Sequence, residues 1–330
     1  MRKVVVVQTF GYWGRRAAHM ALVVIGIATI NFFLLQLAPG DAVTVLAGEA
    51  GAATPEYLAA LRQQFGLDQA LPVQFAKYIG NILTFDLGHS FRHGMSVWRL
   101  IADRIPATFL LMGVSIGFAA LIGSAFGVIA ARYAGRAADT AISTLALLFY
   151  ATPVFWIGLM LVVVFSVWLD WLPVGGMMKI EAGYTGFDHV MDVARHLVLP
   201  AVTLGLFFLA IYTRLMRAAM LEVYGQDFVR TAVAKGVRPH RVVLRHVLRN
   251  ALLPGITMLG MQIGSILGGA VLVETVFSWP GLGRLAFEAL FQRDLNLLLG
   301  ILLCSSVIVV IVNLAVDLLY AWLDPRIELG

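Results

Sequence analysis

Six long stretches without Asp, Glu, Lys or Arg constrain this chain more than any other feature of its sequence. A helix needs about 20 such residues to cross the hydrocarbon core of a bilayer. The stretches contain 24, 27, 30, 18, 24 and 22 residues and lie at 17–40, 105–131, 140–169, 196–213, 250–273 and 295–316. No other charge-free stretch exceeds 11 residues. The sequence therefore predicts six membrane-spanning helices.

The predicted fold is an all-α integral membrane protein with a single transmembrane domain over residues 1–330. Apolar residues cover every side of these helices, which excludes the two-residue alternation of a lipid-embedded barrel. The apolar core of the first span is too long for a cleaved signal peptide, so we expect this span to be retained. The expected spans are 17–38, 106–131, 140–168, 197–214, 252–273 and 296–319.

The composition excludes several classes of protein. Only 13% of the residues are charged and 60% are hydrophobic, whereas soluble domains carry roughly 25% charged residues. A disordered chain, a nucleic-acid-binding domain and a secreted disulfide scaffold are therefore excluded. The single Cys304 cannot form an internal disulfide. Membrane lipid is the expected surrounding of the chain, and nucleic acid is not an expected partner.

The Lys and Arg residues predict the orientation of the helices, because cytosolic loops carry an excess of them. With the N-terminus inside, 15 of the 24 Lys and Arg residues lie on the cytosolic side. We therefore expect both termini in the cytosol and the segment 39–104 outside. That segment is long, and helical spacing of its apolar residues predicts short helices at 54–66, 75–82 and 96–105 on the outer membrane surface. A packed lid and a docking surface for a soluble partner remain equally open interpretations.

The predicted cytosolic loop 215–250 contains helix signals that a merely basic connection does not need. Asp227 can cap a helix over 228–235, and Gly236 is a natural stop. Pro239 then starts a second helix that leads into the fifth span. A short helix held in this way along the membrane is typical of a docking element for a motor protein. A basic loop that reflects only the orientation bias remains the alternative.

Glycines spaced four residues apart let helix backbones approach closely, inside a bundle or across a subunit interface. We expect such packing roles for Gly113 with Gly117, Gly123 with Gly127, and the row Gly260, Gly264 and Gly268. Ionisable residues at membrane depth are candidates for function. We interpret Glu274, at the outer end of the fifth span, as a candidate pathway or gate residue, together with Gln262 and Trp279. Asp317 lies near the cytosolic end of the last span, where a structural role is expected.

The chain lacks the motifs of nucleotide binding, metal binding and nucleophilic catalysis. No GxxxxGK[ST], HExxH, CxxC or GxSxG motif occurs. His89 and His93 are four residues apart, but no third metal ligand accompanies them. We therefore expect no catalytic residue, no cofactor and no metal site in this chain.

Short motifs follow one another in a fixed order along nearly the whole chain. They read LAPGD at 37–41, FGLD at 65–68, LPVQF at 71–75, DLGHSF at 86–91, PAT at 106–108, WLPVGG at 171–176, LPA at 199–201, DFVRTAVAKG at 227–236, RH at 245–246, NALLP at 250–254, ETVFSWPGLG at 274–283, DLLY at 317–320 and DPR at 324–326. Each motif is weak alone. The ordered set resembles the membrane subunits of binding-protein-dependent ABC importers, in the dipeptide, oligopeptide and nickel group.

This resemblance implies the type I ABC importer permease fold in a bacterial inner membrane. It implies a subunit that forms half of a pathway for peptides and is not itself an enzyme. The implied partners are a second homologous permease subunit, two cytosolic ATPase subunits that bind ATP and Mg, and an extracytoplasmic substrate-binding protein. The implied ATPase-coupling helix contains Asp227, Phe228, Arg230, Thr231, Ala232, Lys235 and Gly236.

In that helix, Arg230 and Lys235 are expected to supply polar contacts to the ATPase, and Phe228 and Ala232 the apolar contact. The general importer motif begins with an acid where this chain has Arg230, so a docking salt bridge at that position stays open. Nickel chelates, glutathione and opines remain alternative solutes. A secondary carrier is disfavoured because the spans contain almost no charge for ion coupling. A membrane enzyme is disfavoured because no cluster of catalytic groups occurs.

Overall fold

The computed structural model describes the backbone of residues 2–37, 59, 63, 68–84, 86–90 and 92–323. In these ranges, side chains are described except at 2–13, 15–17, 35, 180, 253, 256–257, 259–269 and 317–323. The chain divides into two compact units. One unit comprises Met1–Asp103, Glu288–Ile311 and Pro325–Gly330, and the other comprises Arg104–Phe287 and Val312–Asp324. That both units form one functional domain stays a prediction.

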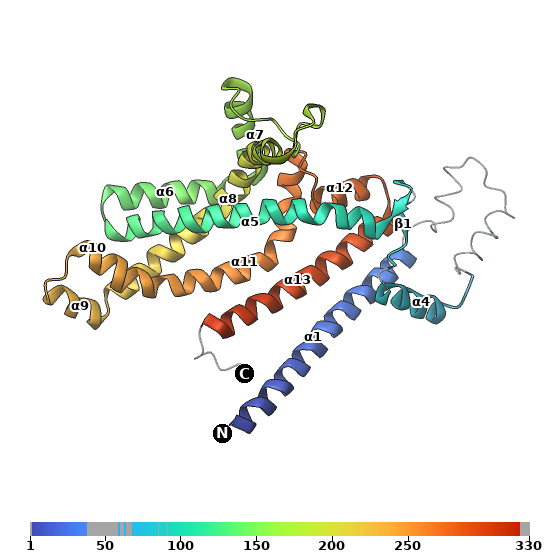
Figure 1. Cartoon of the computed structure of the whole chain (residues 1–330), viewed down its shortest axis with the longest axis horizontal. Helices are drawn as coiled ribbons and strands as arrows, with labels where there is room; N and C mark the ends of the chain where they lie inside the picture. Colours follow the sequence, from blue (N-terminus) through green and yellow to red (C-terminus); the bar gives the residue numbers. More distant parts are fainter. Residues whose placement is uncertain are drawn as a thin grey trace. The chain divides into compact units, whose positions relative to one another are not determined.

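Helices make up nearly all of the described secondary structure (Figure 1), in agreement with the predicted all-α architecture. The α-helices are α1 (Arg2–Leu37), α4 (Leu71–Leu83), α5 (Val97–Arg132), α6 (Ala137–Ala151), α7 (Val154–Leu161), α8 (Gly186–Tyr224), α9 (Asp227–Ala234), α10 (Pro239–Arg241), α11 (Leu248–Val276), α12 (Leu282–Phe291) and α13 (Leu295–Leu323). Two π-helical segments, η1 (Val162–Trp168) and η3 (Val242–Val247), and one 3₁₀ turn, η2 (Ile180–Ala182), connect them. The strands β1 (His89–Ser90) and β2 (Met95–Ser96) form a small antiparallel hairpin.

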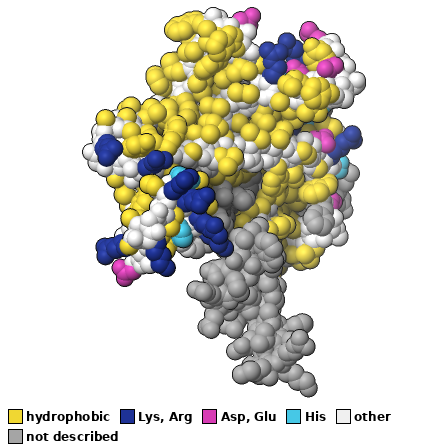
Figure 2. Space-filling model, turned by 60° about the vertical axis from the view of Figure 1, so that its left-hand side comes forward, with side chains coloured by type: hydrophobic (Ala, Val, Ile, Leu, Met, Phe, Trp, Pro, Cys, Tyr) yellow, Lys and Arg dark blue, Asp and Glu magenta, His cyan; other side chains and the backbone are white. Residues whose placement is uncertain are grey.

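Three described helices are long and apolar enough to cross a membrane. They are Val97–Arg132, Gly186–Tyr224 and Leu295–Val316, and the bent pair Ala137–Ala151 with Val154–Trp168 makes a fourth if it counts as one span. Figure 2 shows that hydrophobic side chains cover much of the displayed face, as a lipid-embedded protein requires. The count of six spans stays a prediction.

The predicted span 140–168 is broken in the middle. α6 and α7 meet at an angle of 104°. Thr152 between them has an extended backbone, with ψ of 134°, and Pro153 precedes α7. Proline disfavours the helical conformation of the preceding residue and lacks an N–H, which favours a break at Thr152. Proline alone does not force the break, since α5 continues through Pro106. The helix is bent within the predicted span, and the crossing of the membrane at 140–168 stays a prediction.

Residues 97–105 form the first turns of α5, and Ser96 ends β2, in place of the separate short helix that we predicted at 96–105. α5 runs without interruption from Val97 through Pro106 to Arg132. Val97 and Ile101, at its start, are fully buried. The apolar side chains at the start of α5 are therefore buried in the same uninterrupted helix that continues into the predicted span.

Gly123 and Gly127 let α5 approach α8 closely, as predicted. A Cβ atom added at Gly127 would lie 2.6 Å from the Cβ of Met216 and 2.7 Å from the carbonyl oxygen of Thr213. At Gly123 it would lie 2.8 Å from the carbonyl oxygen of Leu209. These separations are shorter than van der Waals contact, so only glycine fits both positions.

The other predicted glycine contacts have different outcomes. No described atom lies within 4 Å of a Cβ added at Gly113 or Gly117. A packing contact of this pair with the described side chains is therefore not seen, and its packing role stays a prediction. The row Gly260, Gly264 and Gly268 lies in α11, where the structure describes only the backbone. Its packing role stays a prediction.

In the first unit, α4 packs against α1 and confirms the amphipathic stretch predicted at 75–82. The ring centroid of Phe32 lies 5.2 Å from that of Phe75 and 5.7 Å from that of Tyr78. Burial in this contact raises the pKa of Tyr78. The helix predicted at 54–66 lies almost entirely outside the described residues.

The β1–β2 hairpin is fixed to the start of α13 in the same unit. The carboxylate of Asp294 caps α13, accepting the N–H of Leu297 at 3.1 Å, and it also accepts the hydroxyl of Ser90. Nδ1 of His93 lies 3.0 Å from the same hydroxyl oxygen. This part of the predicted outer segment 39–104 is therefore tied to the loop before the last span.

Candidate functional site

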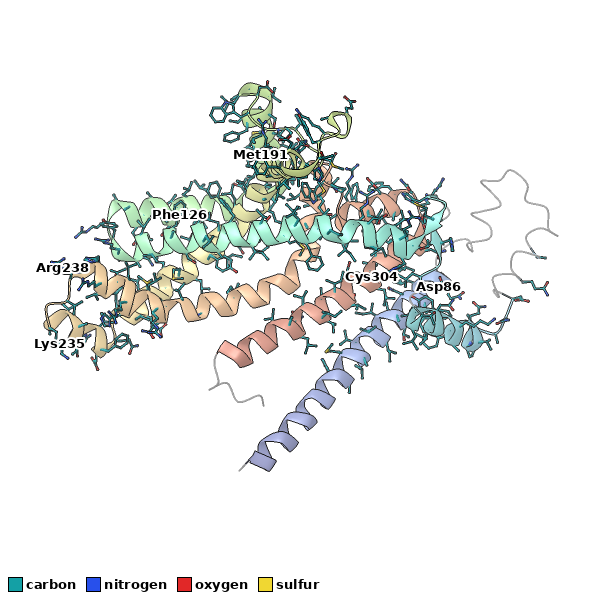
Figure 3. All side chains as sticks on the ribbon, in the orientation of Figure 1. Asp86, Phe126, Met191, Lys235, Arg238 and Cys304 are labelled. Carbon is teal, nitrogen blue, oxygen red and sulfur yellow. The ribbon has the colours of Figure 1, made fainter. Side chains whose placement is uncertain are left out.

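The predicted coupling loop folds as a short helix between two turns. α9 follows α8 after two residues, and α10 and η3 then lead into α11. Pro239 is the first residue of α10, as the restart signal predicts. Figure 3 shows Lys235 and Arg238 at the turn between α9 and α10. The end of one helix before Gly236 and the start of the next at Pro239, both predicted from the sequence, are therefore present.

Gly236 ends α9 in the conformation that the sequence predicts. Its φ is 72°, in the left-handed region. Its N–H donates to the carbonyl of Val233 at 2.9 Å, and the N–H of Val237 donates to the carbonyl of Ala232 at 3.2 Å. These two hydrogen bonds close the last turn of a helix whose next residue is left-handed.

Asp227 does not cap α9, in contrast to our prediction. Gln226 occupies the capping position, and no side-chain hydrogen bond caps the helix. Asp227 is instead the first helical residue, where its negative charge still favours the helix N-terminus. Its carboxylate lies 3.6 Å from Arg230, but both side chains are largely exposed, so this pair stabilises the helix little.

The two faces of α9 have different environments. Val229 and Ala232 are buried, at 3% and 7% exposure. They belong to an apolar cluster, here called the loop core, that also contains Ala131, Met216, Ala219, Met220, Val242, Val243, Val247 and Ala251. Ala232 therefore packs against this chain, and the apolar contact to an ATPase that we predicted for it is excluded by its burial.

The exposed face of α9 carries the other predicted coupling residues. Arg230, Thr231 and Lys235 are exposed. Phe228 is 45% exposed, and Val233, which the sequence analysis did not single out, is 60% exposed. Two apolar side chains in water beside exposed cations form a surface suited to a protein partner. Val233 follows Val229 by four residues, a spacing that predicts the same inner face, so the sequence pattern contains no signal for its exposure.

A partly buried ion pair between α6 and α8 precedes the loop, and the sequence did not reveal it. Nε and Nη2 of Arg217 on α8 donate to the two carboxylate oxygens of Asp139 at 2.6 and 2.8 Å. The N–H of Gly135 and the hydroxyl of Ser143 donate to the same carboxylate. Asp139 is 5% exposed. This bidentate pair fixes the α5–α6 turn against α8, directly before the coupling loop.

Glu274 and Trp279, two of the candidate gate residues, come together in a packed turn between α11 and α12. Both are completely buried. Thr108 donates its hydroxyl to Glu274 at 2.8 Å, and the backbone N–H of Arg284 donates to the other carboxylate oxygen at 2.9 Å. The indole N–H of Trp279 donates to the carbonyl of Ala107 at 2.8 Å.

This arrangement makes Glu274 the cap of α12. Its charge lies at the helix N-terminus, where free N–H groups favour an anion. A Cβ added at Gly281 would overlap the carboxylate, which explains the glycine in the PGLG motif. The side chain of Gln262 lies outside the described atoms. A pathway or gate role for these three residues stays a prediction.

Comparisons with known proteins place this geometry in a family. The sequence model of the binding-protein-dependent transport system inner membrane component matches residues 123–329. The model of the N-terminal part of such membrane components matches residues 10–112. In solved structures, a chain from the MetNI methionine ABC transporter in inward-facing conformation is similar with a TM-score of 0.54 and 18% identity. The alignment covers 68% of this chain and 96% of that one, and it supports the type I importer fold.

Curated relatives are similar over nearly the whole length. A di/tripeptide transport system permease protein of Pseudomonas aeruginosa is 39% identical, over 95% of this chain and 97% of the relative. An oligopeptide transport system permease protein of Bacillus subtilis is 41% identical, over 95% and 98%. A dipeptide transport system permease protein of Escherichia coli is 39% identical, over 95% and 97%. These matches confirm the resemblance to the peptide group, and the chain belongs to the family of binding-protein-dependent transport system inner membrane components.

Proposed function

We propose that this chain is the permease subunit of an ATP-driven importer and forms half of the translocation pathway for di- and oligopeptides. An extracytoplasmic binding protein delivers the peptide. The observation that carries the proposal is the 39–41% identity, over 95% of the chain, to permeases named for di-, tri- and oligopeptide transport. Nickel chelates, glutathione and opines are the alternative solutes.

The proposed complex contains a second homologous permease subunit and two cytosolic ATPase subunits, which bind ATP and Mg and carry out the hydrolysis. In the proposed topology, six helices span the bacterial inner membrane with both termini in the cytosol and 39–104 outside. The exposed face of α9, with Phe228, Arg230 and Val233, docks on an ATPase. The burial of Val229 and Ala232 in the loop core supports this role, because it fixes α9 to α8 and α11. A movement of α9 would therefore be transmitted to these two helices.

Purification from native membranes in mild detergent tests the assembly. We expect an affinity-tagged copy of the chain to co-purify with a second permease and with ATPase subunits in stoichiometric amounts. The variant Phe228→Asp should still co-purify with the second permease but should lose the ATPases, since only the exposed face of α9 is changed. Recovery of the tagged chain alone under conditions that keep it folded contradicts the proposal.

A further inference from the structure

The break between α6 and α7 lies inside a stretch that is apolar enough to cross a membrane. Tyr150, next to the break, lies about 20 Å along α6 from Ala137, at 1.5 Å per residue. The ring of Tyr150 therefore lies well away from the α5–α6 turn. Non-helical backbone at membrane depth is tolerated only where protein buries it or where it lines a water-filled cavity. In secondary transporters, discontinuous helices of this kind form the substrate site.

A cation lies at the level of this break. The guanidinium of Arg214 on α8 covers the ring of Tyr150, with 4.6 Å between Cζ and the ring centroid. The same ring stacks on Phe207, with 5.4 Å between centroids and 16° between planes. Tyr150 is 43% exposed, and Arg214 is exposed as well. The aromatic pair therefore holds the guanidinium in place and leaves its N–H groups accessible.

The neighbouring Arg217 has a structural role, which provides a comparison for Arg214. Arg217, one helical turn further along α8, donates two short hydrogen bonds to the buried Asp139. Among the side chains that the structure describes, none of the carboxylates forms an ion pair with Arg214. A charge at membrane depth is costly unless it faces water or meets an anion. An arginine that served only packing or orientation would extend toward the nearby membrane surface, whereas this one reaches toward the helix break.

We infer that Arg214 and Tyr150 form a carboxylate-binding subsite on the translocation pathway, which takes the C-terminal carboxylate of the peptide during transport. The inference rests on the proposed peptide import. The planar guanidinium matches a carboxylate with two parallel hydrogen bonds. The face of Tyr150 keeps the guanidinium oriented. The headgroup phosphate of a lipid is the competing anion, and the distance of Tyr150 from the α5–α6 turn along α6 argues against it.

Transport by the whole complex in proteoliposomes tests this subsite. The probes are a labelled dipeptide with a free carboxylate and the same dipeptide with a C-terminal amide, each at a concentration that saturates the binding protein. The variants are Arg214→Gln, which removes the charge, and Tyr150→Leu, which removes the aromatic face. Tyr150→Phe keeps the face, and Arg136→Gln removes another exposed arginine as a matched control.

We expect Arg214→Gln to slow transport of the free dipeptide about tenfold or more, the usual effect of losing a charge-assisted hydrogen bond, and to leave the rate for the amide unchanged. Tyr150→Leu should act in the same direction, while Tyr150→Phe and Arg136→Gln should match the wild type. An equal loss for both probes, or no loss, overturns the inference. A loss that depends on the fraction of anionic lipid and not on the peptide carboxylate assigns Arg214 to a headgroup and also overturns it. If wild-type vesicles move neither probe, the proposed function itself fails, which is a distinct result.

Discussion

Gly236 is the residue at which the coupling loop depends most on one backbone conformation. Its φ of 72° lies where any residue with a Cβ is disfavoured, by roughly 1–2 kcal/mol for a side chain in the left-handed region. No described atom lies within 4 Å of an added Cβ. Conformation, and not space, therefore decides which substitution this position tolerates.

Two replacements of Gly236 should show that backbone conformation, and not the space around the side chain, limits this position. We expect Gly236→Val to lower binding-protein-stimulated ATP hydrolysis of the reconstituted complex about tenfold, because roughly 1.4 kcal/mol corresponds to that factor. Gly236→Asn should stay near the wild-type rate, since Asn adopts the left-handed conformation far more readily. Equal rates for the two variants would show that the turn does not control coupling.

Phe228 and Ala232 test the two faces of α9. Phe228→Ser should reduce stimulated hydrolysis several-fold and leave the unfolding temperature of the purified permease nearly unchanged, because the side chain is exposed. Ala232→Glu should lower that temperature, since it forces an unpaired charge into the loop core at a cost of about 2–4 kcal/mol. If Phe228→Ser destabilises the permease as much as Ala232→Glu does, the assignment of faces is wrong.

At the scale of elements, the contact between α5 and α8 is the one that glycine controls most directly. Gly127→Val should overpack it, at a cost of about 1–3 kcal/mol, and reduce the amount of folded permease in the membrane. Gly117→Val makes the same chemical change on the same helix, where an added Cβ meets no described atom. Immunodetection of membrane-inserted protein compares the two variants. Equal abundance would remove the packing role of Gly127.

Helix signals that depend on neighbouring residues could be predicted from the sequence. The stop at Gly236, the restart at Pro239 and the amphipathic face of α4 are all local, and the structure confirms them. The break at Pro153 was also local, but the surrounding charge-free stretch of 30 residues concealed it. The proline rule alone could not have located it, because α5, α8 and α11 continue through Pro106, Pro200 and Pro254.

Contacts between residues distant in the sequence could not be predicted. Asp139 and Arg217 are 78 positions apart, and Thr108 and Glu274 are 166 positions apart. Charge alone marked Glu274 as a pathway candidate, because a single sequence does not reveal that α12 folds back and uses this carboxylate as its cap. The pairing of Arg214 with Tyr150 was hidden for the same reason.

At the scale of the whole molecule, the orientation of the helices can be tested by labelling. In a Cys304→Ser background, a membrane-impermeant thiol reagent applied to intact cells should label a cysteine placed at Gly51 and not one placed at Gly236. The expectation follows from the 15 of 24 Lys and Arg residues assigned to the cytosolic side. Labelling at Gly236 without permeabilisation would reverse the topology and place α9 beyond the reach of a cytosolic ATPase.

The source of the transport energy distinguishes an ATP-driven importer from a self-sufficient carrier. A carrier would couple uptake to an ion gradient through charges within its spans. A permease of the kind proposed here would depend on ATP hydrolysed by its partners. The two therefore differ in what must be supplied to a vesicle, and in which subunits it must contain.

Uptake of a labelled dipeptide into proteoliposomes that contain the complete complex tests this claim most directly. With ATP and Mg inside and the binding protein outside, we predict accumulation of the dipeptide above its external concentration. Accumulation should stop when a non-hydrolysable ATP analogue replaces ATP or when the binding protein is omitted. Accumulation by this chain alone, driven by a proton or sodium gradient without ATP, would contradict the account.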